Sequence, residues 1–472
     1  MSGPGRAGEG RLEAYRAPTG TRDVLPPESA RWQALISTFA GLVGRAGYGL
    51  VQGPVFEDLG VFQKVGASTD VVRKEMYDFE DKGGRQLVLR PEGTAGVVRA
   101  FIQHRPTTPW KVWYAAPNFR YERPQAGRYR QHHQLGVEAI GSDDPDLDVE
   151  VISLAADLYA AVGLERVSLA LNSLGDATCR PAYRAALSAH LATWVGDLCD
   201  EHRERWADNP LRVLDCKRGL CVAATADAPR TVDHLCDPCA RAFDRVQVGL
   251  GALGVAFTIT PRLVRGLDYY GRTTFEFAAA ALEGAQDAVG GGGRYDGLAE
   301  LLGGPPTPGI GFGSGIERIL LACDAEGSFP GPAGGVDVFV VDVTGGDAAR
   351  DLTATLRRAG LAADRAFGGR SMKAQMKLAD RSGAPVAVLV GASEAAAGTV
   401  TIRRMAPGGG QAESAREDLV TSVRAALAKA ALDPARTDPA RTPSLPGAGG
   451  GSQGADEDGA NRPSAGARGA AL

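Results

Sequence analysis

The segment FRYERPQAGRYRQHHQLGVEAIG, residues 119–141, combines a dense group of arginines with a strand of alternating side chains. Pro124 and Gly127 separate two strand-like runs, so the arginines are predicted to lie on and around a hairpin loop. One acid, Glu122, stands among four arginines: Arg120, Arg123, Arg128 and Arg130. Guanidinium groups bind phosphate oxygens with fixed, bidentate geometry. The pattern therefore favours a phosphate clamp over a charged surface hairpin in which Glu122 pairs with arginines.

The second strand of this hairpin has two different faces. Residues two apart along a strand share a face, which places Gln134 and Glu138 together, on either side of Gly136. The opposite face is apolar and consists of Leu135, Val137 and Ala139. The small Gly136 leaves room for a ligand that Gln134 and Glu138 can hydrogen-bond. A solvated sheet face with a glycine bulge is the alternative interpretation.

The composition indicates a globular chain without a net basic charge. The chain has 472 residues, of which 44% are hydrophobic, and a net charge of -4. Two or three domains are expected, and any nucleic-acid contact must come from local basic patches. No apolar run approaches the roughly 18 residues of a membrane span, and the N-terminal residues lack the apolar centre of a secretory signal. We therefore expect a cytoplasmic protein with no membrane segment.

Changes in pattern divide the chain into domains. The Gly-rich residues 1–17 are expected to be flexible. A first domain, 18–328, opens with a predicted helix and continues through short strands. Within it, the segment from about 173 to 252 is rich in helix-forming residues and poor in strand signals, which indicates a helical insertion. The apolar residues of the first helix recur at a helical period: Trp32, Leu35, Ile36, Phe39, Leu42 and Val43.

The C-terminal part begins after a Pro/Gly stretch, 329–335, that is typical of a linker. Residues 336–430 alternate strand and helix patterns, which predicts a small α/β domain with a mostly parallel sheet. Residues 431–472 contain no aromatic side chain and almost no large aliphatic ones. Such a segment cannot bury enough apolar area to offset its ordering entropy, so a disordered tail is expected.

Most of the cysteines lie in the helical insertion, which points to a local feature there. The spacing C-x4-C followed by C-x2-C is compatible with a tetrahedral Zn²⁺ site. The residues concerned are Cys216, Cys221, Cys236 and Cys239. Isolated buried thiols are the alternative, and disulfides are not expected because the cytosol keeps thiols reduced.

One further stretch is predicted to be a strand with polar residues on both faces. Residues 263–277, LVRGLDYYGRTTFEF, are predicted to form a strand with Arg265 and Tyr269 on one face and Asp268 and Tyr270 on the other. Neither a P-loop nor a dinucleotide-binding glycine fingerprint is present in the sequence. A nucleotide, if bound, must therefore be bound by arginines.

Several long motifs make the chain resemble the histidyl-tRNA synthetases, which are class II aminoacyl-tRNA synthetases. The segment 119–141 resembles motif 2, RGLDYYGRTTFEF (265–277) resembles the histidine-specific signature, and GFGSGIERILL (311–321) resembles motif 3. Other stretches fit in the same order: GTRDVLP (20–26), LRPEGT (89–94), NPLRVLD (209–215), GGGRYDGL (291–298) and GGRSMKAQMKLADRSG (368–383). The resemblance runs from about residue 18 to 430.

The resemblance implies an α+β fold. It consists of an antiparallel six-stranded catalytic sheet with flanking helices, a helical insertion and a C-terminal α/β anticodon-binding domain. It also implies a homodimer joined through motif 1, which here is the first helix followed by VQGPVFED (51–58). Patterns of hydrophobicity alone do not predict this dimer.

The resemblance also implies a reaction: ATP, bound with Mg²⁺, activates L-histidine, which is then transferred to tRNA(His). Arg120 and Arg265 are expected to contact the α-phosphate and to be catalytic. Arg128 and Arg318 are expected at the outer phosphates, with Arg318 also over adenine. The remaining ATP residues are Glu122, near the adenine amino group, and His132, at a stacking position where the family usually has Phe.

Two more sets of residues follow from the resemblance. The histidine pocket is expected to contain Glu92, Thr94, Gln134, Glu138, Arg265, Tyr269 and Tyr270. Four basic residues at helical spacing are expected to contact tRNA phosphates, a solvated helix face being the alternative: Arg370, Lys373, Lys377 and Arg381. A regulator that senses histidine or tRNA is the main rival function, but such relatives usually lose ATP-contact residues or the anticodon domain.

Overall fold

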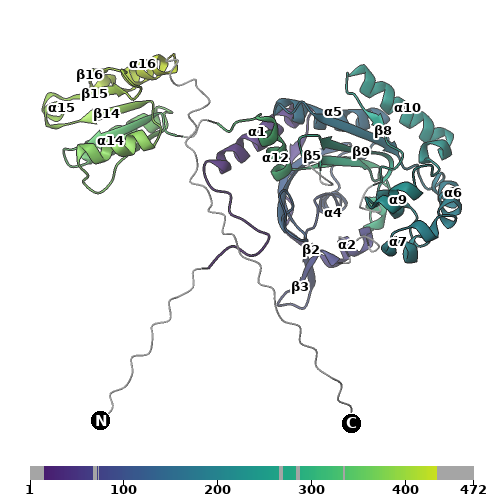
Figure 1. The fold of residues 1–472 in the computed structure, drawn as a ribbon. Helices are drawn as coiled ribbons and strands as arrows, with labels where there is room; N and C mark the ends of the chain where they lie inside the picture. The colour runs from purple at the N-terminus through teal and green to yellow at the C-terminus, as the bar shows by residue number, and fades with distance from the viewer. Residues whose placement is uncertain are drawn as a thin grey trace, which may run out of the picture. The chain divides into compact units, whose positions relative to one another are not determined.

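The computed structural model describes residues 15–66, 72, 74–264, 269–282, 287–332 and 335–432. The chain divides into two compact units, an N-terminal unit (Met1–Ala333) and a C-terminal unit (Gly334–Leu472) (Figure 1). The segments expected to be flexible or disordered, 1–17 and 431–472, lie outside the described residues except for a few at their inner ends. Two residues of the expected linker also lie outside them.

An eight-stranded sheet forms the centre of the N-terminal unit, in the order β1-β5-β6-β11-β10-β9-β7-β8. The six strands from β5 to β7 pair antiparallel, whereas the short edge strands β1 and β8 pair parallel with their neighbours. The strands are β1 (Gly49–Leu50), β5 (Trp110–Phe119), β6 (Gln131–Ile140), β7 (Val167–Ser173), β8 (Thr258–Ile259), β9 (Gly271–Ala279), β10 (Ala288–Arg294) and β11 (Gly309–Gly315). The expected antiparallel six-stranded sheet is confirmed, with one further strand at each edge.

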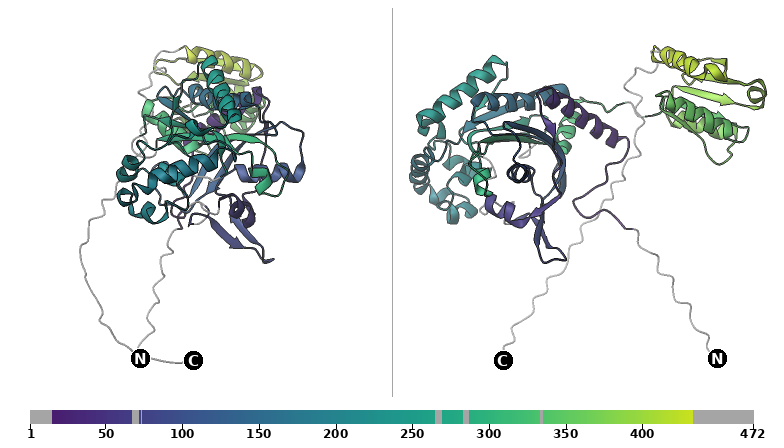
Figure 2. Two further views of the ribbon diagram at one scale, coloured as in Figure 1. Left: turned by 90° about the vertical axis from the view of Figure 1, so that its right-hand side faces the viewer. Right: turned by 180° about the vertical axis from the view of Figure 1, so that it is seen from behind.

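Helices α1 (Glu28–Arg45), α5 (Pro145–Ala161) and α12 (Ile316–Glu326) cover one face of the sheet. Figures 1 and 2 show α1 and α5 outside the curve of the sheet. The helical period predicted for α1 is confirmed, because five of its apolar side chains are buried: Trp32, Leu35, Phe39, Leu42 and Val43. They share one core with the apolar face of β6.

The other face of the sheet curves around α4 (Thr94–His104), as both figures show. This helix packs with α2 (Leu59–Gly66) and α11 (Leu298–Leu301) in a second core. A small antiparallel sheet adjoins it, formed by β2 (Phe56–Asp58), β4 (Gln86–Leu89) and β3 (Tyr77–Glu80). The polar residues of β6 therefore face a separate compartment from the core under α1.

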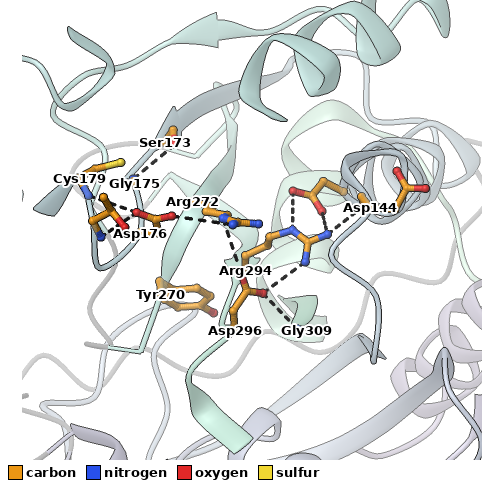
Figure 3. A network of polar contacts seen from close by, with 12 residues as sticks. Asp144, Ser173, Gly175, Asp176, Cys179, Tyr270, Arg272, Arg294, Asp296 and Gly309 are labelled. Carbon is orange, nitrogen blue, oxygen red and sulfur yellow. Dashed lines mark hydrogen bonds and ion pairs between the residues drawn. The ribbon is translucent and has the colours of Figure 1, made fainter. Parts of the chain in front are cut away.

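A buried ion pair holds the end of β10 against α5. Arg294 Nη2 lies 2.7 Å from Asp148 Oδ1, and both side chains are 2% exposed. The same guanidinium donates to the carbonyl oxygen of Ser142 at 3.0 Å. It also donates to that of Asp144 at 2.9 Å (Figure 3). Breaking a buried pair leaves an unpaired charge and costs about 3–5 kcal/mol. The pair therefore fixes one end of the glycine-rich strand that borders the site below.

The helical insertion lies between β7 and β8. No strand interrupts residues 174–257, all of which the structure describes. Figure 1 shows α6, α7 and α9 grouped at one side of the N-terminal unit. The helices are α6 (Arg180–Ala192), η1 (Val195–Asp197), α7 (Asp200–Arg205), α8 (Leu211–Asp215), α9 (Gly219–Ala224), η2 (Thr231–His234) and α10 (Asp237–Ala252).

The C-terminal unit is a five-stranded sheet in the order β13-β12-β14-β15-β16. The prediction of a mostly parallel sheet is wrong, because β14, β15 and β16 pair antiparallel. Eight residues join β14 to β15, and a parallel crossover needs a dozen or more. The elements are β12 (Val338–Asp342), α13 (Asp347–Arg358), β13 (Ala363–Arg365), α14 (Met372–Arg381), β14 (Val386–Val390), α15 (Ala392–Ala397), β15 (Thr399–Arg404), β16 (Gln411–Ala415), η3 (Arg416–Asp418) and α16 (Leu419–Ala431).

Across the described part of both units, no helix combines the length and the apolarity needed to cross a lipid bilayer.

Candidate active site

The arginine-rich segment connects β5 to β6, as its sequence predicts. Arg120 donates its backbone N–H to the carbonyl of Arg130 at 2.9 Å, and a bridge between Gln125 and Arg128 closes the tip. Gly127 at the tip has a φ of 71°, which a residue without a Cβ adopts at little cost. The loop is therefore a closed hairpin that holds its arginines in fixed positions.

The arginines of this hairpin have different partners. Arg128 forms an ion pair with Glu122, so the alternative of internal charge pairing holds for this residue. Arg130 donates to the backbone carbonyl of Glu122 at 3.2 Å and so contacts the loop itself. Arg120 donates from Nε to the carbonyl of Pro91 at 2.9 Å, which orients its guanidinium while leaving further N–H groups for a ligand.

A cleft of about 580 Å³ lies beside the hairpin. Glycines of β10 and β11 line part of it: Gly290, Gly291, Gly313 and Gly315. Arg318 reaches it from α12 and is oriented by the carbonyls of Gly127 and Ala288, which accept at 3.2 and 2.7 Å. The structure brings all of the predicted ATP residues that it describes to this one cleft: Arg120, Glu122, Arg128, His132 and Arg318.

Two adjacent histidines on β6 have different surroundings. His133 Nδ1 lies 3.0 Å from a carboxylate oxygen of Glu317, and its ring meets Trp32 edge-on at 4.9 Å. The ring of His133 is therefore engaged by Glu317 and Trp32. His132 lines the cleft instead. Burial, followed by the positive charges of Arg120 and other neighbours, lowers the pKa of His132 to about 3, so its ring is neutral at physiological pH.

Glu138 is a fully buried carboxyl at the centre of the second predicted pocket. Hydroxyl groups donate to it from Thr94 at 2.7 Å, Tyr295 at 2.5 Å and Tyr114 at 3.3 Å. Desolvation outweighs these donors and raises the pKa of Glu138 to about 8. In the ligand-free protein at pH 7 the carboxyl is therefore mostly protonated, and a base such as an imidazole can accept its proton or its hydrogen bond.

Glu92 provides a second buried acid next to Glu138. Its carboxylate accepts the backbone N–H groups of Thr94 and Ala95, at 2.7 and 2.8 Å, at the first turn of α4. The hydroxyl of Tyr269 donates to it at 3.4 Å. Burial raises the pKa of Glu92 as well. Two acids with little access to water form a site that stabilises a cationic ligand such as an ammonium group.

The space above Gly136 is filled, contrary to the expectation that it leaves room for a ligand. A Cβ on Gly136 would lie 2.3 Å from Cζ of Tyr114, whose ring comes from the neighbouring strand β5. The glycine admits this ring, and the ring carries a hydroxyl to Glu138. Gln134, two residues before Gly136, accepts from Asn118 Nδ2 at 2.6 Å and lines the cleft of the ATP residues.

The tyrosines of the histidine-specific signature lie side by side. Tyr269 and Tyr270 are both buried, with ring centroids 4.7 Å apart, and both precede the first residue of β9, Gly271. The prediction that they lie on opposite faces of a strand is therefore wrong, because the strand begins after them. Arg265, predicted to be catalytic and to bind histidine, lies outside the described residues, as does Asp268.

Three pocket residues were missed by the sequence analysis: Tyr114, Asn118 and Tyr295. Tyr114 and Asn118 belong to β5, in which buried side chains alternate with less buried ones. The sequence of this segment predicts a strand but does not indicate that these two residues lie in a pocket. Tyr295 lies in the motif GGGRYDGL, which was recognised without a role for its tyrosine. For Tyr114 and Asn118, a polar residue on the inner face of a predicted central strand is the signal that identifies the position.

The four predicted zinc cysteines do not form one group, which corrects that prediction. Cys216 and Cys221 lie with Cys199 and His202, and the four ligand atoms are within 4.8 Å of one another. The second pair gathers with two residues from the start of the insertion, in the group Asp176, Cys179, Cys236 and Cys239. Spacing along the chain cannot identify these partners because the helices of the insertion fold back on themselves.

Three of the four predicted tRNA contacts lie on α14 and are exposed: Lys373, Lys377 and Arg381. Arg370 is also exposed but precedes the helix, whose N-cap is Ser371. Near this surface Phe367 is 65% exposed, and the guanidinium of Arg365 lies 4.7 Å from its ring centroid. An exposed aromatic ring among basic side chains is suited to stacking on an unpaired base.

Known proteins resemble this chain over both units. The family described as histidyl-tRNA synthetase matches residues 20–319, and the anticodon binding domain family matches residues 337–426. The histidine–tRNA ligase of Mycolicibacterium vanbaalenii is 51% identical over 424 residues, which cover 88% of this chain and 99% of that protein. The crystal structure of apo histidyl-tRNA synthetase from S. aureus matches with a TM-score of 0.75 and 35% identity, covering 87% of this chain and all of that one.

A histidyl-tRNA-synthetase-like protein from Bacillus halodurans, described as an ATP phosphoribosyltransferase regulatory subunit/histidyl-tRNA synthetase, matches with a TM-score of 0.59. At 20% identity this likeness shows the fold alone. The antiparallel catalytic sheet and the anticodon-binding unit together define a class II aminoacyl-tRNA synthetase. Because one family match spans most of the N-terminal unit and close relatives cover nearly the whole chain, the chain belongs to the histidyl-tRNA synthetase family.

Proposed function

We propose that this chain is a histidine–tRNA ligase. The carboxylate of L-histidine attacks the α-phosphorus of ATP, which gives histidyl-adenylate and releases diphosphate. The histidyl group then passes to the 3′ end of tRNA(His), and AMP is released. The observation that carries the proposal is the position of Gln134. This residue lines the arginine-rich cleft and stands on the same face of β6 as Glu138, so the two predicted pockets adjoin. A carboxylate bound in one pocket can thus reach a phosphate bound in the other.

The ATP side uses fixed positive charge. A carboxylate attacking the α-phosphorus brings two anions together, and preorganised cations in a site with little water stabilise that approach. We assign this role to Arg120 and, from the resemblance of its motif, to Arg265, which lies outside the described residues. Arg128 and Arg318 hold the outer phosphates of ATP, which enters with Mg²⁺, and His132 stacks on adenine as a neutral ring.

The histidine side recognises both ends of the amino acid. Glu92, Thr94 and Gln134 hold the ammonium group, while Glu138 and Tyr270, with Tyr269 nearby, hold the imidazole. A buried site with polar groups that require partners rejects analogues lacking them by about 10⁴ to 10⁵. No editing step is needed for such discrimination.

The working form of the enzyme is a cytoplasmic homodimer that binds tRNA(His) through its C-terminal unit. Around β1 and β2 three large apolar side chains are exposed, in the segment that resembles motif 1: Leu50, Val55 and Phe56. Exposed apolar side chains clustered on one segment are typical of a subunit interface. The exposed basic residues of α14 are proposed to contact tRNA phosphates.

The deciding experiment is ATP–pyrophosphate exchange by the purified protein with each of the twenty amino acids. Exchange with L-histidine alone, followed by aminoacylation of tRNA(His), is expected. A folded protein that binds histidine but supports no exchange with any amino acid would instead identify a histidine-sensing regulator. Arg265→Ala tests the catalytic assignment, since loss of one preorganised cation should slow exchange by at least about 100-fold.

A further inference from the structure

We propose that Cys199, His202, Cys216 and Cys221 bind one Zn²⁺ ion, which holds the insertion at the edge of the ATP cleft. Bound zinc itself does not depend on the proposed function. The expected effect of zinc on the KM for ATP rests on the proposed function.

The spacing of the four ligand atoms fits a tetrahedral ion. Zn–S bonds of about 2.3 Å and a Zn–N bond of about 2.0 Å place tetrahedral ligand atoms roughly 3.5–3.8 Å apart. Here Cys199 Sγ lies 3.1 Å from His202 Nδ1 and 4.0 Å from Cys216 Sγ, and His202 Nδ1 lies 3.9 Å from Cys221 Sγ. Three thiols and one imidazole form a ligand set typical of structural zinc.

The ligands come from three helices that are too short to be stable alone. Cys199 is the N-cap of α7 and His202 lies within it, Cys216 is the C-cap of α8, and Cys221 lies in α9. These helices have six, five and six residues. Isolated helices below about 12 residues are marginal in water, and small units with little core commonly rely on a metal or disulfide cross-link. One ion at this point joins all three.

The surroundings of the group also resemble a zinc site. The side chains of Cys199 and Cys221 are buried, at 4% and 0% exposure, whereas His202 and Cys216 are partly accessible. The backbone N–H of Cys199 donates to Cys221 Sγ at 3.4 Å. Such N–H donors stabilise a metal-bound thiolate and orient it.

The group is connected directly to the cleft. Cys216 stands between Asp215 and Lys217, and both of these residues line the cleft that contains the predicted ATP residues. Arg262 Nη2 donates to the carbonyls of Leu214 and Cys216, at 3.0 and 3.2 Å, and so ties the same segment to the body of the N-terminal unit. An ion on Cys216 therefore fixes where Asp215 and Lys217 stand relative to bound ATP.

The second group, Asp176, Cys179, Cys236 and Cys239, is a weaker candidate for a zinc site. One carboxylate oxygen of Asp176 already accepts the backbone N–H groups of Thr178 and Cys179, at 2.9 and 3.2 Å. Its other oxygen faces the guanidinium of Arg272 (Figure 3), and the distance to Nη2 is 3.9 Å. With this carboxylate engaged, the group offers three thiols. It therefore provides the matched control.

Zinc content is the first test and is independent of catalysis. Full-length protein, purified without chelators, is analysed for metals as wild type, Cys221→Ser, Cys239→Ser, His202→Ala and His202→Cys. The expected result is at least one zinc per chain in the wild type, loss of one in Cys221→Ser and His202→Ala, and retention in Cys239→Ser. His202→Cys restores a four-ligand set and should retain zinc, which separates ligation from a mere folding defect.

The second test measures the effect on ATP use. After removal of zinc by chelation, or in Cys221→Ser, the KM for ATP in pyrophosphate exchange should rise at least about fivefold, while kcat and the KM for histidine change little. Adding ZnCl₂ should reverse the effect of chelation but not that of the substitution. A folded zinc-free protein with an unchanged KM for ATP would contradict the link to the cleft.

Other outcomes would overturn the zinc site itself. These are a wild type that binds added ZnCl₂ no more tightly than Cys199→Ser/Cys221→Ser, loss of zinc only in Cys239→Ser, or a Cys199–Cys216 disulfide in protein purified anaerobically. A zinc-loaded protein that supports no exchange would count against the proposed function and leave the zinc site standing.

Discussion

Glu138 is a residue whose burial decides its charge. Three hydroxyl donors surround its carboxyl, yet desolvation raises the pKa of Glu138 from the ordinary value of 4.5 to about 8. At a pH between these two pKa values, Glu138 keeps its proton in the folded protein but has lost it in the unfolded chain. Stability must therefore fall as pH rises through this window, by as much as about 1.4 kcal/mol per pH unit.

Glu138→Gln tests this charge state. The amide cannot lose a proton, so the melting temperature of the wild type should fall relative to that of the variant between about pH 5 and pH 8, and the difference should level off above that range. Calorimetry or dye-based melting of both proteins measures it. The exposed Glu300→Gln on α11 is the control and should follow the wild type at every pH. Equal pH dependence of Glu138→Gln and wild type would show that Glu138 is ionised when folded.

His132 is a second residue where burial fixes the protonation state. Replacing it with Ala should raise the KM for ATP in exchange by about tenfold, since stacking of an aromatic ring on a base is worth about 1–3 kcal/mol. His132→Phe should retain the wild-type KM or lower it. The pKa of His132 is lowered to about 3, so its ring does not titrate near neutral pH. The ratio of the KM of His132→Ala to that of the wild type should therefore stay constant between about pH 6 and pH 8.

Steady-state exchange at several pH values provides these constants. A ratio that changes across neutral pH would mean that His132 titrates there and is accessible to water. His133 is not an equivalent position, because its ring is held between Glu317 and Trp32.

At the scale of the element, helix α14 presents a basic face that its helical period already predicts. Lys373→Ala/Lys377→Ala should weaken binding of tRNA(His) at least about fivefold and reduce the salt dependence of binding, because fewer counterions are released. Histidine-dependent ATP–pyrophosphate exchange should not change, since that step needs no tRNA. Filter binding over a range of salt concentrations is the measurement.

The matched control is Lys429→Ala, an exposed lysine on α16 of the same unit. It should leave tRNA binding and its salt slope as in the wild type. An equal loss with the control would assign the effect to net charge rather than to the face of α14.

At the scale of the whole molecule, the proposed dimer rests on the exposed apolar side chains near β1 and β2. Leu50 and Phe56 are 55% and 53% exposed in the isolated chain. Leu50→Asp/Phe56→Glu should shift the protein from dimer to monomer in sedimentation velocity at micromolar concentrations, because charges in the core of an interface lose solvation without gaining partners. Leu253→Asp, at a site that is 60% exposed just after α10, should remain dimeric. A wild-type monomer would contradict the proposed dimer.

Local patterns in the sequence were sufficient to predict the main elements, the two-unit organisation and the family. The helical period of α1, the arginine hairpin between β5 and β6 and the two faces of β6 are all local patterns, and each is confirmed by the structure. Such patterns are readable because helix and strand periods depend on neighbouring residues only. The assignments of ATP and histidine contacts rest on the order of the motifs and stay predictions, although the structure gathers the described residues into two adjoining pockets.

Contacts between residues that are distant in the sequence could be identified only from the folded chain. Tyr295 donates to Glu138 across 157 positions in the chain, and the ring of Tyr114 fills the space above Gly136. The cysteines also regroup, with Cys199 and His202 joining Cys216 and Cys221. These contacts depend on strand order and on how the insertion folds back, and neither property leaves a periodic trace in the sequence. The chemical type of each site residue could therefore be predicted from the sequence, whereas the residues that contact it could be identified only from the structure.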